Sequence, residues 1–281
     1  ALLYPVGYMV YASFLECNPS QRIHEADWVG LRNYANLLND PNFHESFWVT
    51  ITFAAVVVGL EMVLGVGLAL LLDRKIRGMS VLRTIFILPM MIAPIVVGLM
   101  WRYMYRPSVG ILHRTLNDLG FSSIPWLSDP SWALASVIIA DVWQWTPFIF
   151  ILALAALQSL PQSALEASRI DGATGWQQIV HIKLPLMAPV LIIAGLLRLI
   201  DAFKVLEVIL VLTNGGPGLS TEIMSLRIQR TTQEFRELGV AAAMSNYLLI
   251  LLLMITVVMF VVNKTLEARS NRMRRQVEAD A

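Results

Sequence analysis

The apolar runs of this chain constrain its fold more than any other feature, because several are long enough to cross a lipid bilayer. A helix of about 20 apolar residues spans the hydrocarbon core. Runs of this kind occupy residues 47–72, 84–105, 131–157, 189–213 and 242–263, and a shorter run opens the chain at 1–15. At ~1.5 Å per residue the opening run is too short to cross alone, so we expect the first helix to be truncated at its start. The sequence therefore predicts an all-α, polytopic membrane protein with six transmembrane helices.

The composition indicates the same class of protein. Charged residues make up 15% of the chain, whereas soluble domains contain ~25%, and 57% of the residues are hydrophobic. The chain shows no basic patch interleaved with aromatic residues, which argues against nucleic acid as a partner. We expect residues 1–281 to form a single transmembrane domain whose main surroundings are the lipid bilayer.

The distribution of lysine and arginine predicts the orientation. Positive residues crowd the loop after the second span, at Arg74, Lys75, Arg77 and Arg83. A second group ends the chain, at Lys264, Arg269, Arg272, Arg274 and Arg275. Such residues are in excess in cytoplasmic loops. We therefore expect both termini, the 264–281 tail and, by alternation, residues 158–188 to be cytoplasmic.

The polar segment at residues 158–188 has helical character, although it lies between two apolar runs. Pro161 suits a first helical turn, and Gly172 stands where a helix needs a left-handed stop. A second helix is predicted to start at Thr174 and to end at Pro185. By pattern alone, an ordinary amphipathic loop at the membrane interface explains this segment equally well.

The residues of this segment also resemble a known motif. Glu166-Ala167-Ser168, Asp171-Gly172-Ala173 and Ile182-Lys183-Leu184-Pro185 are similar to the EAA loop of permease subunits in bacterial binding-protein-dependent ABC importers. The one departure is Ser168, which replaces the third small residue. Residues 28–34, the span with Pro89 and Pro94, and residues 212–217 resemble the carbohydrate-uptake branch, which imports di- and oligosaccharides, glycosides and glycerol phosphates.

This resemblance covers the chain from Tyr4 to about Lys264, and it implies a function without catalysis. It implies the type I ABC importer permease fold in the bacterial cytoplasmic (inner) membrane, with each permease forming half of the translocation path. The implied partners are a second permease subunit, two ATPase subunits and an extracytoplasmic solute-binding protein. Residues 158–188 would form the coupling loop to an ATPase, with six implied contact residues: Glu166, Ala167, Ser168, Asp171, Gly172 and Ala173.

Several kinds of chemistry are not expected in this chain. None of its lysines follows a glycine, so a P-loop is excluded, and ATP and Mg²⁺ would bind to the partner ATPase subunits. We expect no cofactor and no metal site, because the four histidines lack metal-ligand spacing and Cys17 is the sole cysteine. The motifs H-E-x-x-H and G-x-S-x-G are also absent, which argues against a membrane protease or lipase.

Charged residues inside the apolar runs are candidates for the translocation path. A charge at the bilayer centre costs ~2.5–3.5 kcal/mol on insertion scales, so it is expected to face a cavity or a partner. Arg198, Asp201, Lys204 and Glu207 recur every three residues, which predicts one helical stripe. Such a stripe is either a self-neutralising ladder or a polar wall of the path. The wall is favoured for Asp201 and Lys204, while both alternatives stay open for Arg198 and Glu207. For Glu61 a contact between helices is favoured.

The fourth apolar run offers groups suited to sugar recognition. Its aromatic, amide and carboxylate candidates for the path are Asp141, Trp143, Gln144, Trp145 and Phe148. Ordinary packing between helices explains the same aromatic residues. Two other functions remain open for the whole chain. One is a secondary transporter or channel that uses the charges of the fifth run, although no inverted repeat is visible. The other is a purely structural assembly subunit.

Overall fold

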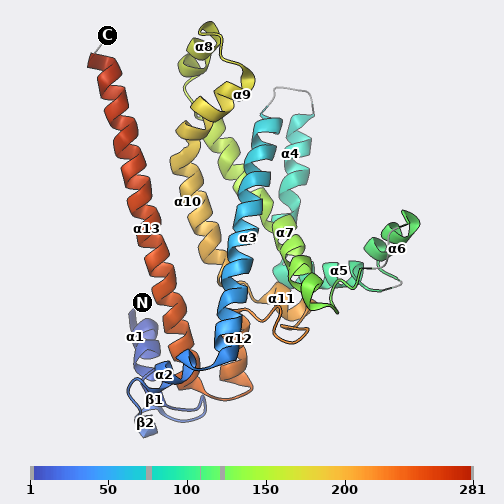
Figure 1. The fold of residues 1–281 in the computed structure, drawn as a ribbon, viewed down its shortest axis with the longest axis vertical. Helices are drawn as coiled ribbons and strands as arrows, with labels where there is room; N and C mark the ends of the chain where they lie inside the picture. The colour runs from blue at the N-terminus through green and yellow to red at the C-terminus, as the bar shows by residue number, and fades with distance from the viewer. Residues whose placement is uncertain (1–2, 74–77, 108, 121–123, 280–281) are drawn as a thin grey trace. The chain divides into compact units, whose positions relative to one another are not determined.

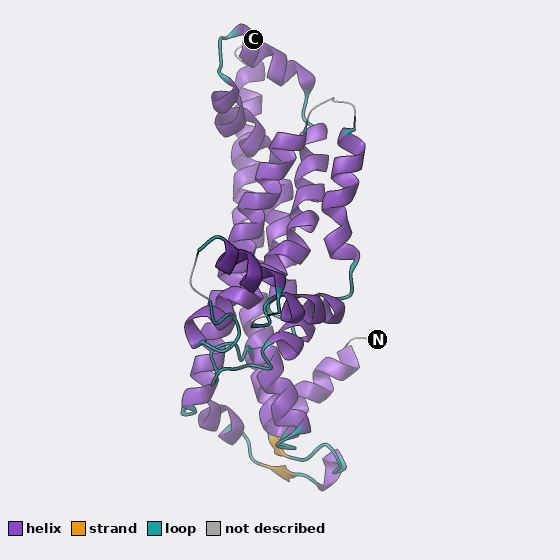
Figure 2. Ribbon diagram, turned by 90° about the vertical axis from the view of Figure 1, so that its right-hand side faces the viewer, coloured by secondary structure: helices purple, strands orange, loops and turns teal. Residues whose placement is uncertain are grey.

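The computed structural model describes residues 3–73, 78–107, 109–120 and 124–279. Within these ranges the chain is mostly helical, as the all-α prediction requires (Figures 1 and 2). Strands β1 (Leu15–Glu16) and β2 (Asp27–Trp28) form a short antiparallel pair that places Leu15 opposite Trp28. Arg74, Lys75 and Arg77, used above for orientation, lie outside the described residues.

The helices differ widely in length. The long ones are α3 (Pro41–Leu72), α7 (Pro130–Gln158), α10 (Leu184–Ala202) and α13 (Leu238–Ala279). The shorter ones are α1 (Leu3–Ala12), α2 (Arg32–Leu38), α4 (Met79–Ile87), α5 (Pro94–Met104), α6 (Ile111–Asp118), α8 (Gln162–Ile170), α9 (Gly175–Gln178), α11 (Glu207–Leu212) and α12 (Met224–Gln233). Two 3₁₀ turns, η1 (Ile23–Glu25) and η2 (Leu88–Met91), and a π turn, η3 (Ile179–Lys183), complete the order.

The chain folds into two compact units, each built from three segments. Unit 1 comprises Ala1–Val57, Ala93–Asp141 and Ile200–Leu253, and unit 2 comprises Val58–Ile92, Val142–Leu199 and Met254–Ala281. The buried core of unit 2 contains apolar residues from α3, α7 and α10, among them Ala69, Ile149 and Met187. Gly65 permits this packing, because a Cβ there would lie 2.8 Å from the Ile149 Cβ.

Four helices of the described chain are long and apolar enough to cross a membrane: Pro41–Leu72, Pro130–Gln158, Gly175–Ala202 and Leu238–Val261. A fifth span results if the bent pair Val81–Met91 and Pro94–Met104 counts as one. The opening helix α1 has 10 residues, too few to cross by itself. The fold is thus that of a multi-span membrane protein, while six spans and cytoplasmic termini stay predictions.

The third apolar run is not the continuous helix predicted for residues 84–105. The backbone is extended at Ile92 and Ala93, with ψ of 134° and 136°, and a new helix starts at Pro94. Proline supplies no N–H and disfavours a helical conformation in the residue before it, which explains a break here. The Gln144 side chain donates to the Ile92 carbonyl at 3.0 Å and so satisfies an oxygen at the break.

Two of the rings that end this run do not form the interfacial belt expected of them. Trp101 and Tyr105 are buried inside unit 1, and the Tyr105 hydroxyl donates to the Ser136 carbonyl at 3.0 Å. Only Tyr103 is well exposed. The aromatic residues here serve packing within the protein, where a buried tyrosine needs a hydrogen-bond partner.

The fifth apolar run is also interrupted, so the predicted helical stripe is wrong. Helix α10 ends at Ala202, and α11 starts at Glu207 after four non-helical residues. Arg198 and Asp201 therefore lie on α10, whereas Lys204 lies in the break. The Ser225 hydroxyl donates to the Val205 carbonyl, which stabilises backbone that the helix no longer satisfies.

Candidate functional site

The segment from α8 to α10 contains the predicted coupling residues, and its first helix, α8, ends at the predicted glycine. Gly172 has a φ of +77°, a conformation that glycine adopts without strain. The Ala173 N–H donates to the Ser168 carbonyl at 2.9 Å, and the Gly172 N–H donates to the Arg169 carbonyl at 3.1 Å. This pair of bonds is the Schellman arrangement, so α8 ends in a defined turn.

The next helix begins at the predicted residue. Thr174 accepts the Gln177 backbone N–H at 3.3 Å through its hydroxyl, and its own N–H donates to the Gln177 side-chain oxygen at 2.8 Å. These two bonds form a capping box. The prediction that Pro185 ends this helix is wrong, since Gly175–Ala202 is continuous. The π turn η3 ends at Lys183, two residues before the proline, and a hydrogen-bond ladder widened there accommodates a residue without an N–H.

The six predicted coupling residues differ in exposure. Glu166, Ala167, Asp171 and Gly172 are exposed, and Ala173 is half-buried. Ser168 is buried, and its hydroxyl accepts a hydrogen bond from the Gln178 side chain at 2.9 Å. The exposed residues can contact a partner directly, whereas Ser168 acts within the segment.

Two apolar side chains beside these residues were missed as contact candidates. Ile170 is 87% exposed and Trp176 is 73% exposed, and they flank the Gly172 turn in sequence. Their presence in a polar stretch was the available signal, because a loop in water has no need of a tryptophan. Large exposed apolar side chains of this kind mark interaction surfaces.

The residues predicted to line a translocation path are divided between the two units. Asp141, Asp201 and Lys204 belong to unit 1, whereas Trp143, Gln144, Trp145 and Phe148 belong to unit 2. Asp141 and Gln144 are fully buried, and Gln144 holds the Ile92 carbonyl. Lys204 is exposed, and Asp201 is half-buried. The seven path candidates thus come from both units, and their role in the path stays a prediction.

Glu61 makes the contact between helices that its sequence position favours. The Arg198 Nε lies 2.7 Å from one Glu61 oxygen, and the Arg198 Nη2 donates to the other at 2.9 Å, which joins α10 to α3. Neither side chain is more than 1% exposed. The guanidinium also lies 5.5 Å from the Trp145 ring centroid on α7. Helices α3, α7 and α10 of unit 2 therefore meet at one buried ion pair whose two charges cancel. A low-dielectric interior tolerates charges that are paired in this way.

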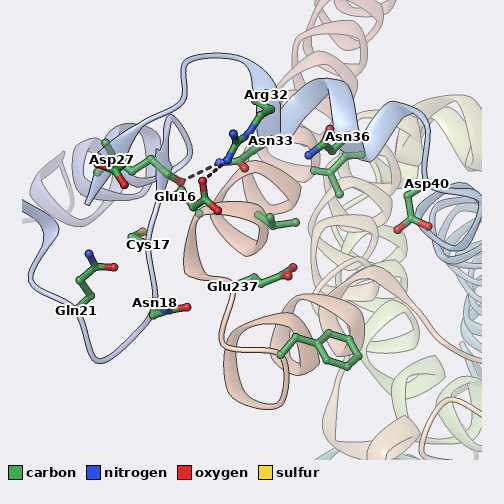
Figure 3. Close-up of a pocket in the computed structure, with 15 residues that line it drawn as sticks. Glu16, Cys17, Asn18, Gln21, Asp27, Arg32, Asn33, Asn36, Asp40 and Glu237 are labelled. Carbon is green, nitrogen blue, oxygen red and sulfur yellow. Dashed lines mark hydrogen bonds and ion pairs between the residues drawn. The ribbon is translucent and has the colours of Figure 1, made fainter. Parts of the chain in front are cut away.

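A cavity of about 650 Å³ lies in unit 1 among β1, β2, α2 and the start of α13 (Figure 3). Its lining is mainly polar and includes Glu16, Asp27, Asn36 and Glu237. Arg32 pairs with Glu16 across it, as the dashed lines show. Burial raises the pKa of the Cys17 thiol at its edge, against a smaller lowering by the Gly239 backbone. Among the described residues, no group of three or more His, Cys, Asp or Glu side chains could hold a metal ion.

Comparison with known proteins identifies the family. Residues 61–272 match the family described as "Binding-protein-dependent transport system inner membrane component". The trehalose/maltose transport system permease protein MalF of Thermococcus litoralis is 41% identical over 236 residues, which cover 84% of this chain and 80% of that protein. The sulfoquinovosyl glycerol transport system permease protein SmoG of Agrobacterium fabrum is 30% identical over 92% of this chain and 83% of its own length.

A solved structure shows the same fold. It is a bacterial ABC transporter involved in the import of the acidic polysaccharide alginate, and one of its chains superposes with a TM-score of 0.82 at 23% identity. The match covers 94% of this chain and 90% of that one. The chain therefore belongs to the family of inner-membrane permease components of binding-protein-dependent ABC transport systems, as a multi-pass subunit without catalytic activity of its own.

Proposed function

We propose that this chain is one of two permease subunits of an ATP-driven importer for a sugar, a glycoside or a glycerol phosphate. The support comes from its relatives, whose names specify trehalose and maltose, sulfoquinovosyl glycerol, and sn-glycerol 3-phosphate. In this proposal six spans, with both termini in the cytoplasm, form half of the translocation path. The seven path candidates, from Asp141 to Lys204, belong to the same proposal.

The partners proposed are a second permease subunit, two ATPase subunits and an extracytoplasmic solute-binding protein. A solved relative in fold is described as a complex with a periplasmic protein that holds an alginate pentasaccharide. ATP and Mg²⁺ bind to the ATPase subunits, and this chain carries no cofactor. It needs such partners because its sequence contains no Gly-Lys pair to cradle phosphates.

The α8–α9 segment is the proposed contact with an ATPase subunit. One observation supports this part of the proposal. Ile170 and Trp176 are largely exposed on either side of the Gly172 turn, which backbone hydrogen bonds stabilise. A rigid apolar anchor loses little conformational freedom on docking, and tryptophan is prominent among residues that dominate binding energy. The exposed carboxylate of Glu166 adds a group that a basic partner residue can pair with.

The test is assembly of the purified transporter with Ile170→Asp and Trp176→Asp variants of this chain. We expect each variant to insert into the membrane and to lose the ATPase subunit in a pull-down, because aspartate would have to be desolvated at the contact. Leu119→Asp is the matched control, since Leu119 is 67% exposed on a different loop. The docking proposal would be contradicted if both Ile170→Asp and Trp176→Asp retained the ATPase subunit as the wild type does.

A further inference from the structure

The buried contact between Ser168 and Gln178 determines how α8 is attached to the rest of unit 2. The Gln178 Nε2 donates to the Ser168 Oγ at 2.9 Å, and this hydroxyl donates in turn to the Leu165 carbonyl at 2.8 Å. Only 6% of Ser168 and 7% of Gln178 is exposed. Loss of the Ser168 hydroxyl would leave the buried Gln178 amide without this partner, which is costly away from water, whereas loss of Gln178 would leave Ser168 with its bond to the Leu165 carbonyl.

The two ends of α8 are attached in different ways. At its start, Pro161 occupies the capping position with an extended backbone and makes no side-chain cap. At its end, two backbone bonds close the turn at Gly172, and the Ser168–Gln178 bond then joins α8 to the last residue of α9. Side-chain contacts thus attach α8 to the segment that follows it.

That following segment is one helix from Gly175 to Ala202. Gln178 lies near its beginning, and Arg198, which pairs with Glu61 of α3, lies near its end. A displacement at Gln178 therefore acts on the same helix that carries the buried charge pair. Coupling through packed helices and hydrogen bonds requires such a contiguous physical connection.

We propose that Ser168 and Gln178 are positioning residues that fasten α8 to the α9–α10 helix, so that movement of the coupling loop is passed into α10. This inference rests on the proposed docking of the loop on an ATPase subunit. The bond adds to the two backbone hydrogen bonds that close the turn at Gly172. Its loss leaves only those two bonds to hold α8 against the following helix, so less of the movement reaches α10.

Serine at this position also explains the departure from the EAA pattern noted above. Ser168 is buried at its contact with Gln178 of α9, and serine supplies a hydroxyl there while staying small. An alanine here would allow the same close approach with no side-chain bond to Gln178. The hydroxyl, rather than the small size, is what the proposal makes essential.

The experiment compares solute transported per ATP hydrolysed by the complete transporter in proteoliposomes, with Ser168→Ala, Gln178→Leu and the double variant of this chain. Each single variant removes the same bond, so we expect each ratio to fall at least threefold and the double variant to fall no further. Ser131→Ala and Gln233→Leu are matched controls, because both residues are exposed and lie outside the α8–α9 segment. Their ratio should equal that of the wild type.

Two further measurements separate positioning from simple destabilisation. The ATPase subunit should stay bound to Ser168→Ala and Gln178→Leu in the pull-down, so that a lower ratio does not reflect lost assembly. Spin labels at the exposed positions Arg169 and Val190 should show a broader distance distribution in Gln178→Leu than in the wild type. A wild-type ratio in both Ser168→Ala and Gln178→Leu overturns the inference, as does loss of the ATPase subunit from both variants.

The outcomes also distinguish this inference from the docking proposal. If docking fails, the Ile170→Asp and Trp176→Asp variants still bind the ATPase subunit. If only the positioning role fails, those two variants lose the ATPase subunit while Ser168→Ala transports with the wild-type ratio.

Discussion

Pairs of guanidinium and carboxylate groups stabilise both compact units, but the two units expose them differently. In unit 2 the Arg198 and Glu61 side chains are 1% and 0% exposed, and the Arg198 guanidinium lies against the Trp145 ring. In unit 1 Arg227 lies 2.7 Å from Asp40 and 3.0 Å from Glu222, and Arg230 shares the same glutamate. There the side-chain exposure ranges from 4% for Glu222 to 29% for Asp40.

This difference in exposure indicates how much each ion pair contributes to the stability of the fold. Removing one partner of a buried pair leaves a charge in a medium that cannot solvate it, so the penalty is large. In a shared, partly hydrated network, the remaining partners and water compensate for a lost group. We therefore expect the effect of a substitution to follow the exposure of the pair it breaks.

The largest effect is expected for the buried pair in unit 2. Arg198→Met or Glu61→Leu alone should destabilise the protein by ~3–5 kcal/mol, because the other charge stays buried. The double variant should recover much of that loss, since two apolar groups replace a neutral pair. Thermal unfolding in detergent measures all three, and a double variant as unstable as the sum of the single variants would contradict the comparison.

A smaller effect is expected for Glu222→Gln, which removes the charge shared by two arginines. We expect a loss of ~1–3 kcal/mol, because Arg227 keeps Asp40 as a partner and Arg230 keeps the Asn214 carbonyl. Glu234→Gln is the control, since this carboxylate is 63% exposed and 4.0 Å from Arg230. Unfolding temperatures that fall equally in the two variants would show that burial does not set the effect.

Two substitutions at Asp40 distinguish the contribution of its charge from that of its helix cap. Its side chain pairs with Arg227 and also accepts the Asn42 backbone N–H at 3.0 Å at the start of α3. Asp40→Asn retains the cap and should cost under ~1 kcal/mol. Asp40→Ala loses both and should cost ~1 kcal/mol more. Equal melting curves for the two variants would mean that the cap contributes nothing.

The smallest effect is expected at the rim of the unit 1 cavity. Arg32 and Glu16 form an ion pair whose side chains are 55% and 65% exposed. Exposed pairs of this kind contribute little, and salt screens them further. Arg32→Gln should therefore leave the unfolding temperature unchanged within error at 0.5 M salt, and a clear drop there would break the proposed dependence on exposure.

The sequence predicted the features that depend on local chemistry. Gly172 and Thr174 specify a turn and a helix start through their own backbone preferences, and the structure has both. Glu61 was predicted to contact another helix because a lone charge in an apolar run needs a partner. The family followed from the residues around Glu166, which the comparisons confirm.

The errors had both remote and local causes. The break after Ala202 is stabilised by Ser225, a contact that a run of apolar residues does not show. The break at Ile92 had a local signal in Pro94, although the prediction kept this run as one helix. Pro185 was expected to end a helix because the widened turn before it has no sequence signature. The Ser168–Gln178 bond was missed for the same reason, since it joins two helices across a turn.

The π turn at Ile179–Lys183 affects how side chains before it are rotated about the helix axis relative to side chains after it. A π turn is an α-helix with one residue inserted, and each residue advances an α-helix by about 100°. Deleting a single residue there would restore regular α geometry and leave the two flanks close to their present orientation, because the wider turn already absorbs the extra residue. The π turn thus keeps Trp176 and Gln178 in nearly the angular register, relative to the face that carries Arg198, that an α-helix one residue shorter would have.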